Sequence, residues 1–168
     1  DTAYDMLDRI TAMTGAAGMQ RYEISAYARD GHQCFHNTNY WQFGDYLGIG
    51  AGAHGKLSFA HRIVRQVKIR DPQRYMDAAL AGRALASDED VRRKDLPFEY
   101  MLNALRLRGG FAVQDYLDRT GLPVSTIQSA LDAAQRKGLV TLQGSHVQPT
   151  ERGFDFLSDL QELFLADE

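Results

Sequence analysis

The sequence predicts a mixed α/β chain in which a short helix-and-strand region precedes a mainly helical α+β unit. The first observation is a helix, a glycine-bearing connection and a strand within residues 2–27, which together make half of a βαβ repeat. The second is the order helix, helix, helix, hairpin, helix over residues 97–168, which is the order of a winged-helix unit. Between them, residues 28–60 are rich in Gly, Asn, His and aromatic side chains, which is typical of a functional loop region.

The first helix is expected over residues 2–14, because apolar side chains recur there at spacings of three and four with Asp and Arg between them. The Gly15–Gly18 segment should end this helix. Residues Tyr22–Tyr27 alternate in polarity and predict a strand. Half a βαβ repeat cannot bury both of its faces alone, and the chain begins within a helix without an initiator Met. We therefore expect the chain to be part of a longer protein.

Two segments separate this region from the C-terminal unit. Residues Tyr46–Gly55 are rich in glycine, and we expect a short buried strand that runs into a loop which another backbone or a ligand can approach closely. Residues 61–96 first carry basic side chains and then the acidic cluster Asp88–Asp90. We expect a helix over Tyr75–Leu85 with a solvated connector around it.

The C-terminal unit follows from its stop signals and its apolar periodicity. Pro97 suits the first turn of a helix that should end at Gly109–Gly110. Ser125 and Gln128 have the spacing of a capping box at the start of the third helix. The elements expected after the first helix are helices at about 112–119, 125–137 and 151–165 and a hairpin at about 139–147.

The composition is that of a globular chain and narrows the classes of function. Hydrophobic residues make up 44%, and no run approaches the ~20 apolar residues of a membrane span. The net charge of −3 argues against a generic nucleic-acid binder. The expected recognition helix has Arg136 and Lys137 only at its end, which favours partner binding over DNA readout. The single Cys34 excludes an internal disulfide and a multi-cysteine metal site within this chain, and it fits a reducing, cytoplasmic location.

The densest group of chemically active side chains lies at residues 32–41, and it permits several interpretations. His32, Cys34 and His36 resemble part of a zinc site, although a fourth ligand and paired spacing are missing. Cys34 beside a histidine also has the parts of a nucleophile–base pair. An exposed loop with turn-capping Asn residues is a further interpretation. Finally, His36 could bind haem iron while Tyr40 and Trp41 pack on the porphyrin.

The glycines of residues 48–55 also leave two alternatives open. They could cradle a phosphate or a nucleotide, but the spacing Gly48-x-Gly50-x-Gly52 departs from the dinucleotide pattern G-x-G-x-x-G. They could equally belong to a barrel strand whose glycines admit close packing.

Three stretches in the first third of the chain carry a family resemblance. They are Tyr22–Arg29, the His-Asn-x-x-Tyr-Trp motif of residues 36–41, and Gly44–His54. On these residues the chain resembles the HemW-type haem chaperones, which are radical S-adenosylmethionine relatives of oxygen-independent coproporphyrinogen III oxidase. The resemblance covers nearly the whole chain and extends through the segments Phe98–Met101, Leu105–Arg108 and Leu160–Leu165.

The resemblance implies a fold and a function. Residues 1–60 would be the last strands and helices of a partial (β/α) radical SAM barrel, residues 61–96 a connector with a helix, and residues 97–168 a HemN-type, winged-helix-like C-terminal domain. The implied function is that of a chaperone that binds haem and delivers it to recipient proteins. One alternative is an oxygen-independent coproporphyrinogen III oxidase, and a second is a winged-helix interaction module.

The resemblance also implies site residues, cofactors and partners. Haem would be bound by His36, Asn37, Tyr40 and Trp41, with His36 as the iron ligand. S-adenosyl-L-methionine would lie close to Ala28, Gly50, Gly52 and His54. A [4Fe–4S] cluster would belong to the full-length protein, because the Cys-x-x-x-Cys-x-x-Cys motif that holds it is absent here. Haem-recipient proteins and possible self-association are the expected interactions, with no nucleic acid and no integral membrane span.

Overall fold

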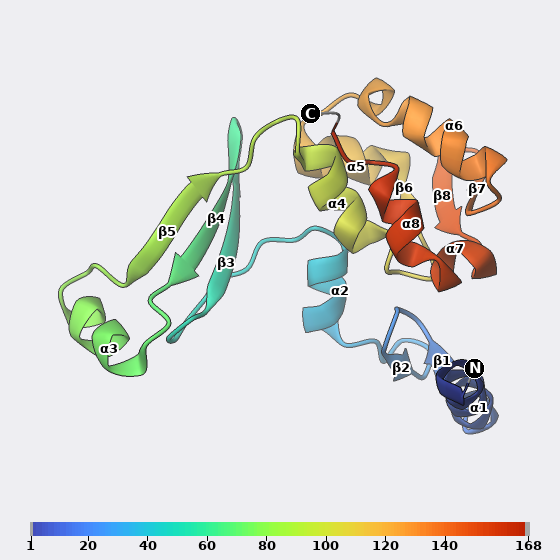
Figure 1. The fold of residues 1–168 in the computed structure, drawn as a ribbon, viewed down its shortest axis with the longest axis horizontal. Coiled ribbons are helices and arrows are strands. Elements are labelled where there is room, and N and C mark those ends of the chain that lie inside the picture. Colours follow the sequence, from blue (N-terminus) through green and yellow to red (C-terminus); the bar gives the residue numbers. More distant parts are fainter. Residues whose placement is uncertain (1, 167–168) are drawn as a thin grey trace.

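The computed structural model describes residues 2–166, in which a small N-terminal region, an extended three-stranded sheet and a C-terminal helical unit are joined by one short helix (Figure 1). Figure 1 shows this helix, α2 (Phe35–Trp41), between the β1–β2 pair and the three-stranded sheet. The same helix lies next to α4 (Leu96–Ala104) of the C-terminal unit. Its central place explains why the candidate site is built around it.

The N-terminal region begins with the expected helix, α1 (Thr2–Ala16), which has no buried residue among those described. Strands β1 (Gln20–Arg21) and β2 (Tyr27–Ala28) follow and pair in an antiparallel register. The predicted strand over Tyr22–Tyr27 is therefore wrong, since most of these residues form the connection between β1 and β2. The polar side chains explain this, because the Glu23 carboxylate accepts hydrogen bonds from the backbone N–H and hydroxyl of Ser25.

Three strands within residues 54–90 form an antiparallel sheet with the order β3-β4-β5, and two of them, β4 and β5, lie in residues 61–96, where only a connector with a helix was expected. Ile63 and Val64 of the central strand are buried, and the register sets basic residues of this strand opposite an acidic edge strand, as in the pair Arg65 and Glu89. The charge runs that indicated a solvated connector thus belong to two paired strands. The strands are β3 (His54–Phe59), β4 (Arg62–Lys68) and β5 (Leu85–Asp90).

The expected helix at Tyr75–Leu85 lies earlier in the chain, as α3 (Pro72–Leu80). Asp71 caps its N-terminus by accepting a hydrogen bond from the backbone N–H of Arg74 at 2.8 Å, and Pro72 occupies the first turn. The glycine-rich segment before β3 is not a buried strand, since it shows only one isolated bridge, between Tyr46 and Lys56.

The C-terminal unit has the expected order of helices and hairpin around a sheet of order β6-β8-β7. Its core holds Met101, Leu105, Tyr116, Val147 and Leu160, all fully buried. The last helix is divided in two at Phe156. The elements are α4, β6 (Phe111–Ala112), α5 (Val113–Thr120), η1 (Val124–Thr126), α6 (Gln128–Arg136), β7 (Val140–Gln143), β8 (His146–Pro149), α7 (Glu151–Asp155) and α8 (Leu157–Glu162).

Phe43 connects α2 to this core. It follows the helix, is 1% exposed and places its ring 5.5 Å from that of Tyr100 in an edge-to-face contact. Its backbone has φ of 57°, the left-handed conformation, and the next residue must be small because a Cβ at Gly44 would lie 2.1 Å from Oδ1 of Asn39. These contacts fix the direction of the backbone where it leaves α2 and hold the Phe43 ring in the core.

Candidate functional site

The residues of the His-Asn-x-x-Tyr-Trp motif lie on helix α2 and not on the exposed loop that their composition indicated. Its first turn begins at Cys34 without a side-chain cap, and Thr38 contributes hydroxyl hydrogen bonds to the backbone carbonyls of Cys34 and Phe35. The helix ends where the backbone N–H of Gly44 binds the carbonyl of Asn39 at 2.7 Å. The motif is thus presented on a short but well-terminated helix.

His36 and Tyr40 are one helical turn apart and lie on the same face of α2. Their ring centroids are 4.7 Å apart, and the ring of Tyr40 lies 4.1 Å from that of Tyr46. The imidazole is exposed to solvent, whereas both tyrosines are half-buried. Asn37 is half-buried and follows His36 in the first turn. This face of the helix therefore offers an accessible imidazole, backed by aromatic rings, to an approaching metal or haem iron.

Trp41 is separated from this row. It lies about 140° around the helix axis from His36, since α-helical residues are about 100° apart. The Arg106 guanidinium covers its ring at 4.2 Å from the centroid, and its indole Nε1 is buried without a hydrogen-bond partner in the described part of the chain. Tyr40 and Trp41 consequently do not flank one common ring position here. Trp41 instead anchors α2 to the segment that follows α4.

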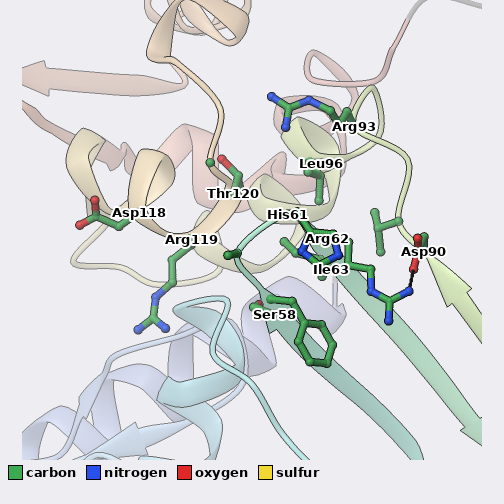
Figure 2. Close-up of a pocket in the computed structure, with 14 residues that line it drawn as sticks. Ser58, His61, Arg62, Ile63, Asp90, Arg93, Leu96, Asp118, Arg119 and Thr120 are labelled. Atoms are coloured by element: carbon green, nitrogen blue, oxygen red, sulfur yellow. Dashed lines mark hydrogen bonds and ion pairs between the residues drawn. The ribbon is translucent and has the colours of Figure 1, made fainter.

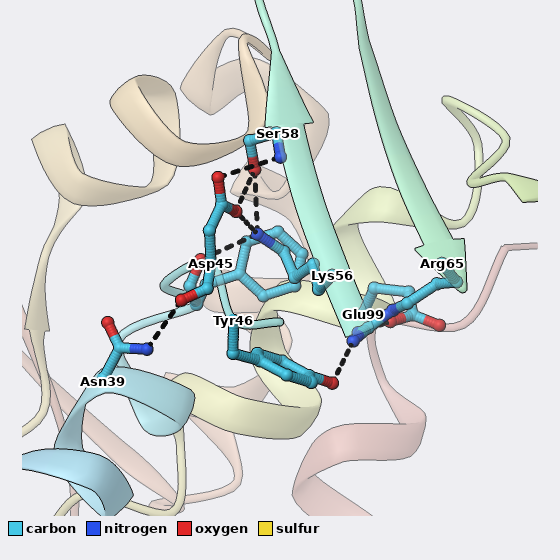
Figure 3. Close-up of polar contacts among 8 residues, drawn as sticks. Asn39, Asp45, Tyr46, Lys56, Ser58, Arg65 and Glu99 are labelled. Carbon is cyan, nitrogen blue, oxygen red and sulfur yellow. Dashed lines mark hydrogen bonds and ion pairs between the residues drawn. The ribbon is translucent and has the colours of Figure 1, made fainter. Parts of the chain in front are cut away.

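A buried lysine, which sequence reasoning missed, organises the segment after α2 (Figure 3). Lys56 is 1% exposed, and its Nζ donates to the carbonyl of Phe43, to Oδ1 of Asp45 and to Oγ of Ser58, each at 2.9 Å. The ammonium also lies 4.2 Å from the centroid of the Phe43 ring. All three ammonium protons therefore have an oxygen acceptor. The signal in the sequence was a single lysine in a short strand of mixed polarity, which is too weak to find the site.

Burial and hydrogen bonds shift the pKa values of Lys56 and Asp45. Burial lowers the pKa of Lys56 from its usual range, and the neighbouring Asp45 opposes that effect. Burial acts to raise the pKa of Asp45, but hydrogen bonds from Lys56 and Ser58 outweigh it and the pKa is lowered. The two groups form an ion pair in which the lysine is buried and the carboxylate is partly exposed.

Tyr46 is held from several sides. Its backbone N–H and carbonyl both pair with Lys56, with N···O distances of 3.0 Å. Its hydroxyl accepts a hydrogen bond from Nη1 of Arg65 at 2.9 Å, and the same guanidinium binds Glu99 of α4 at 2.5 Å. Figure 3 shows these partners arriving from β4 and from α4. Burial raises the pKa of Tyr46, so its phenol is neutral and able to accept this hydrogen bond.

The metal-binding and nucleophilic interpretations of residues 32–36 find no support in the geometry. Among residues 2–166, no group of three or more His, Cys, Asp and Glu side chains is placed to hold a metal ion. Cys34 is exposed, and no hydrogen bond joins its thiol to a histidine in the described residues. A protein ligand set for zinc is therefore not formed by His32, Cys34 and His36.

The four residues expected beside S-adenosylmethionine are not brought together. Ala28 lies in β2, whereas His54 begins β3, and Figure 1 shows these strands on opposite sides of α2. The backbone N–H of Gly50 already donates to the hydroxyl of Tyr75 at 3.2 Å, and that of Gly52 donates to the carbonyl of Ile69 at 2.9 Å. Because these N–H groups are engaged, they do not form an open cradle for a phosphate or a carboxylate. The assignment stays a prediction.

A cavity of about 520 Å³ lies elsewhere, where the turn between β3 and β4 meets the ends of α5 and β5 (Figure 2). Basic side chains line it, but the guanidinium groups of Arg93 and Arg119 point in different directions, and Arg62 pairs with Asp90 at 3.4 Å. The cavity therefore lacks a convergent set of donors for one anionic group.

No helix within residues 2–166 combines the length and the apolar character needed to cross a membrane.

Comparisons with known proteins place the chain in a family. Residues 91–156 match the model of the HemN C-terminal domain. The chain is 44% identical over 168 residues to the heme chaperone HemW of Escherichia coli and 41% identical over 169 residues to that of Haemophilus influenzae. These alignments cover 99% and 100% of this chain but 43% of each relative, so the chain spans less than half of the length of these curated relatives.

The fold itself matches a solved structure. Coproporphyrinogen III oxidase (HemN) from Escherichia coli, described as a radical SAM enzyme, superposes with a TM-score of 0.68 over 96% of this chain and 40% of that one, at 16% identity. At this identity the match supports the fold alone. The sequence matches, and not the structural one, lead to one conclusion: the chain belongs to the HemW family and includes a HemN C-terminal domain.

Proposed function

We propose that this chain takes part in binding haem as cargo and in handing it to recipient proteins, as the haem-binding part of a haem chaperone. Relatives at 41–44% identity that bear the name heme chaperone support this role. The observation that carries the proposal is the exposed imidazole of His36, which makes a tilted ring contact with Tyr40 on helix α2. An imidazole nitrogen is a common axial ligand of haem iron.

Each motif residue then has its own role. His36 binds the iron through a neutral ring nitrogen, and Asn37 offers amide groups that can orient a propionate or the surrounding loop. Tyr40 supports the imidazole through its ring contact. Trp41 acts at a distance from the iron, because its contact with Arg106 secures the helix that carries the ligand. This differs from the initial expectation that Trp41 packs on the porphyrin.

The residues present do not fit the iron–sulfur cluster of a radical SAM enzyme. Such a cluster needs three cysteine thiolates from its motif, and the sequence contains one cysteine. We therefore derive no radical step for this chain, and we assign the cluster and S-adenosylmethionine to the longer protein. The oxidase alternative gains nothing from the structural match, because 16% identity supports a shared fold and not a shared reaction.

We also propose the finer architecture as a working division. Residues 1–60 would complete a partial radical SAM barrel, residues 61–96 would link the two parts, and residues 97–168 would form a winged-helix-like domain. The order of the C-terminal helices and the β7–β8 hairpin supports the last assignment. Strands β3 and β4 lie on either side of the boundary at residue 60 and pair with each other, so the linking region shares a sheet with the end of the first part.

The C-terminal domain would contact proteins and not DNA. In α6 the carboxylate of Asp132 accepts a hydrogen bond from Gln128, so the leading face of the helix that would read bases presents an acidic group. The exposed apolar residues of α1 support the possibility of self-association. The single cysteine supports a reducing, cytoplasmic location. The identity of the recipient of haem would be set by surfaces outside the motif.

The proposal is tested by titrating ferric haem into the chain and following the Soret band. We expect a saturable, red-shifted band in the wild type and a loss of affinity of roughly tenfold or more in His36→Ala, because iron ligation is lost. His32→Ala is the matched control, since His32 is also exposed but lies before α2. Trp41, the single tryptophan, gives a second signal through quenching of its fluorescence by haem.

Equal haem affinity and an unchanged Soret band in His36→Ala would remove His36 from the site. A loss of affinity that is equal in His36→Ala and His32→Ala would indicate non-specific attraction to histidines and would also contradict the proposal.

A further inference from the structure

Three aromatic rings form a row that runs from the exposed start of α2 toward the body of the chain. The row consists of His36, Tyr40 and Tyr46, with ring centroids 4.7 Å and 4.1 Å apart. Exposure decreases inward, since the imidazole is exposed and the two tyrosines are half-buried. The orientation of the outer ring therefore depends on the rings behind it.

The outer ring has little else to hold it. In the described residues, the imidazole of His36 makes no hydrogen bond and no ion pair, and its recorded ring contact is with Tyr40. An exposed side chain with such sparse contacts normally samples several rotamers on the nanosecond timescale. A single iron-binding orientation would then need support from the neighbouring ring.

The inner ring is held firmly. Both backbone polar groups of Tyr46 pair with Lys56, and its hydroxyl accepts a hydrogen bond from Arg65, which in turn binds Glu99 of α4. The preceding residue, Asp45, accepts hydrogen bonds from Lys56 and Ser58 (Figure 3). Three elements of the fold thus converge on this one tyrosine.

A further bond ties the same segment back to the helix. The side-chain amide of Asn39 donates to the backbone carbonyl of Asp45 at 3.0 Å. This bond fixes the position of α2 relative to Tyr46, so the middle ring, Tyr40, is placed against a rigid partner. The row consequently has one fixed end and one free end.

We propose that Tyr46 is a positioning residue for the His36 imidazole and that it acts through the ring of Tyr40. The assignment adds to the site a residue outside the His-Asn-x-x-Tyr-Trp motif. Its consequence for haem rests on the proposed function, whereas the positioning itself is a property of the chain without ligand. Offset or tilted ring contacts favour defined geometries, so removal of the inner ring should release the middle and outer rings.

The test compares the wild type with Tyr46→Leu, Tyr46→Phe and Tyr27→Leu. Phe keeps the ring and removes the hydrogen bond from Arg65. Tyr27 is the matched control, because it is half-buried and shares a side-chain hydrogen bond with Thr11 but has no recorded contact with the row. Circular dichroism identifies variants that fold, and Tyr46→Met, whose flexible side chain fills the gap better, replaces Tyr46→Leu if that variant does not.

The first readout is made without haem. Nuclear Overhauser contacts between the His36 imidazole and the Tyr40 ring, assigned with the aid of His36→Ala, should be strong in the wild type, Tyr46→Phe and Tyr27→Leu and lost in Tyr46→Leu. Unchanged contacts in a folded Tyr46→Leu or Tyr46→Met variant would overturn the inference.

The second readout is haem affinity, which should fall roughly threefold to tenfold in Tyr46→Leu and by less than twofold in Tyr46→Phe and Tyr27→Leu. Equal affinities of Tyr46→Leu and the wild type, when His36→Ala is impaired, would contradict the inference for binding. If His36→Ala binds haem normally, the proposed function fails, and the contacts measured without haem still decide whether Tyr46 positions the imidazole.

Discussion

The C-terminal unit and the region around α2 are stabilised in different ways. The C-terminal unit is built on a continuous apolar core in which residues such as Met101, Tyr116 and Leu160 are completely buried. Around α2, the decisive contacts are polar or aromatic, and the buried Lys56 makes three of them. The comparison indicates that apolar burial in the C-terminal unit stabilises most of the fold. Around α2, ion pairs and ring contacts instead orient exposed side chains.

The α1 helix extends this contrast. It has no buried residue among those described, although its apolar periodicity is clear in the sequence. Periodicity therefore predicted the helix but not its burial, because burial depends on a packing partner. The same periodicity in α4 does produce buried positions, since α8 packs against it.

The largest effect that separates the two regions is expected at Gly153. A Cβ at this position would lie 1.8 Å from the carbonyl oxygen of Leu139, so Gly153→Ala must displace α7 from the backbone that leads into β7. We expect a loss of about 3 kcal/mol in the free energy of unfolding, measured by urea denaturation. Gly15→Ala in α1 is the control, because nothing lies within 4 Å of that position. Equal stability of Gly153→Ala and the wild type would show that the core tolerates this shift.

A smaller effect is expected when Lys56 is replaced by Met. The substitution keeps an apolar stem but removes the ammonium donor to the carbonyl of Phe43 and the ion pair with Asp45, whose carboxylate keeps its hydrogen bonds from Ser58. We expect a loss of about 2 kcal/mol. Lys68→Met, in the adjacent strand and without an ion pair among the described residues, should change stability by less than about 0.5 kcal/mol. If the two variants have the same unfolding midpoint, the ion pair does not stabilise the α2 region.

The smallest effect is a pH dependence that arises from Asp45. Its pKa in the folded chain is lowered, so the unfolded chain binds more protons near the ordinary pKa of an Asp side chain, 3.8. The stabilisation is present above this value and is lost as the pH falls through the folded pKa. Thermal unfolding midpoints should therefore decrease less below about pH 4 in Asp45→Asn than in the wild type. Parallel curves for the two proteins would contradict this assignment.

Much of the C-terminal unit could be predicted from the sequence, because local signals and global packing agree there. Pro97 and the apolar spacing of α4 favour the same helix, although it ends at Ala104 and not at the predicted Gly109–Gly110. The β3-β4-β5 sheet could not be predicted in this way. Its central strand mixes arginines with aliphatic residues, and its pairing with an acidic strand on the far side of α3 leaves no local signal.

The candidate site shows the same limit. The residues His36, Tyr40 and Trp41 were found by a motif, but a motif does not give the direction of each side chain. The helical geometry of α2 separates Trp41 from the other two, and Arg106, remote in sequence, covers its ring. Lys56 and Tyr46 were missed because their importance depends on contacts with residues from other elements.

The central claim is that the His36 imidazole is a ligand of haem iron. The most direct measurement is pulsed electron paramagnetic resonance of ferric haem bound to chain labelled with ¹⁵N-histidine. The claim predicts nitrogen hyperfine couplings from a protein imidazole that vanish in His36→Ala and persist in His32→Ala. Couplings that survive unchanged in His36→Ala, or that are absent from the wild type, would contradict it.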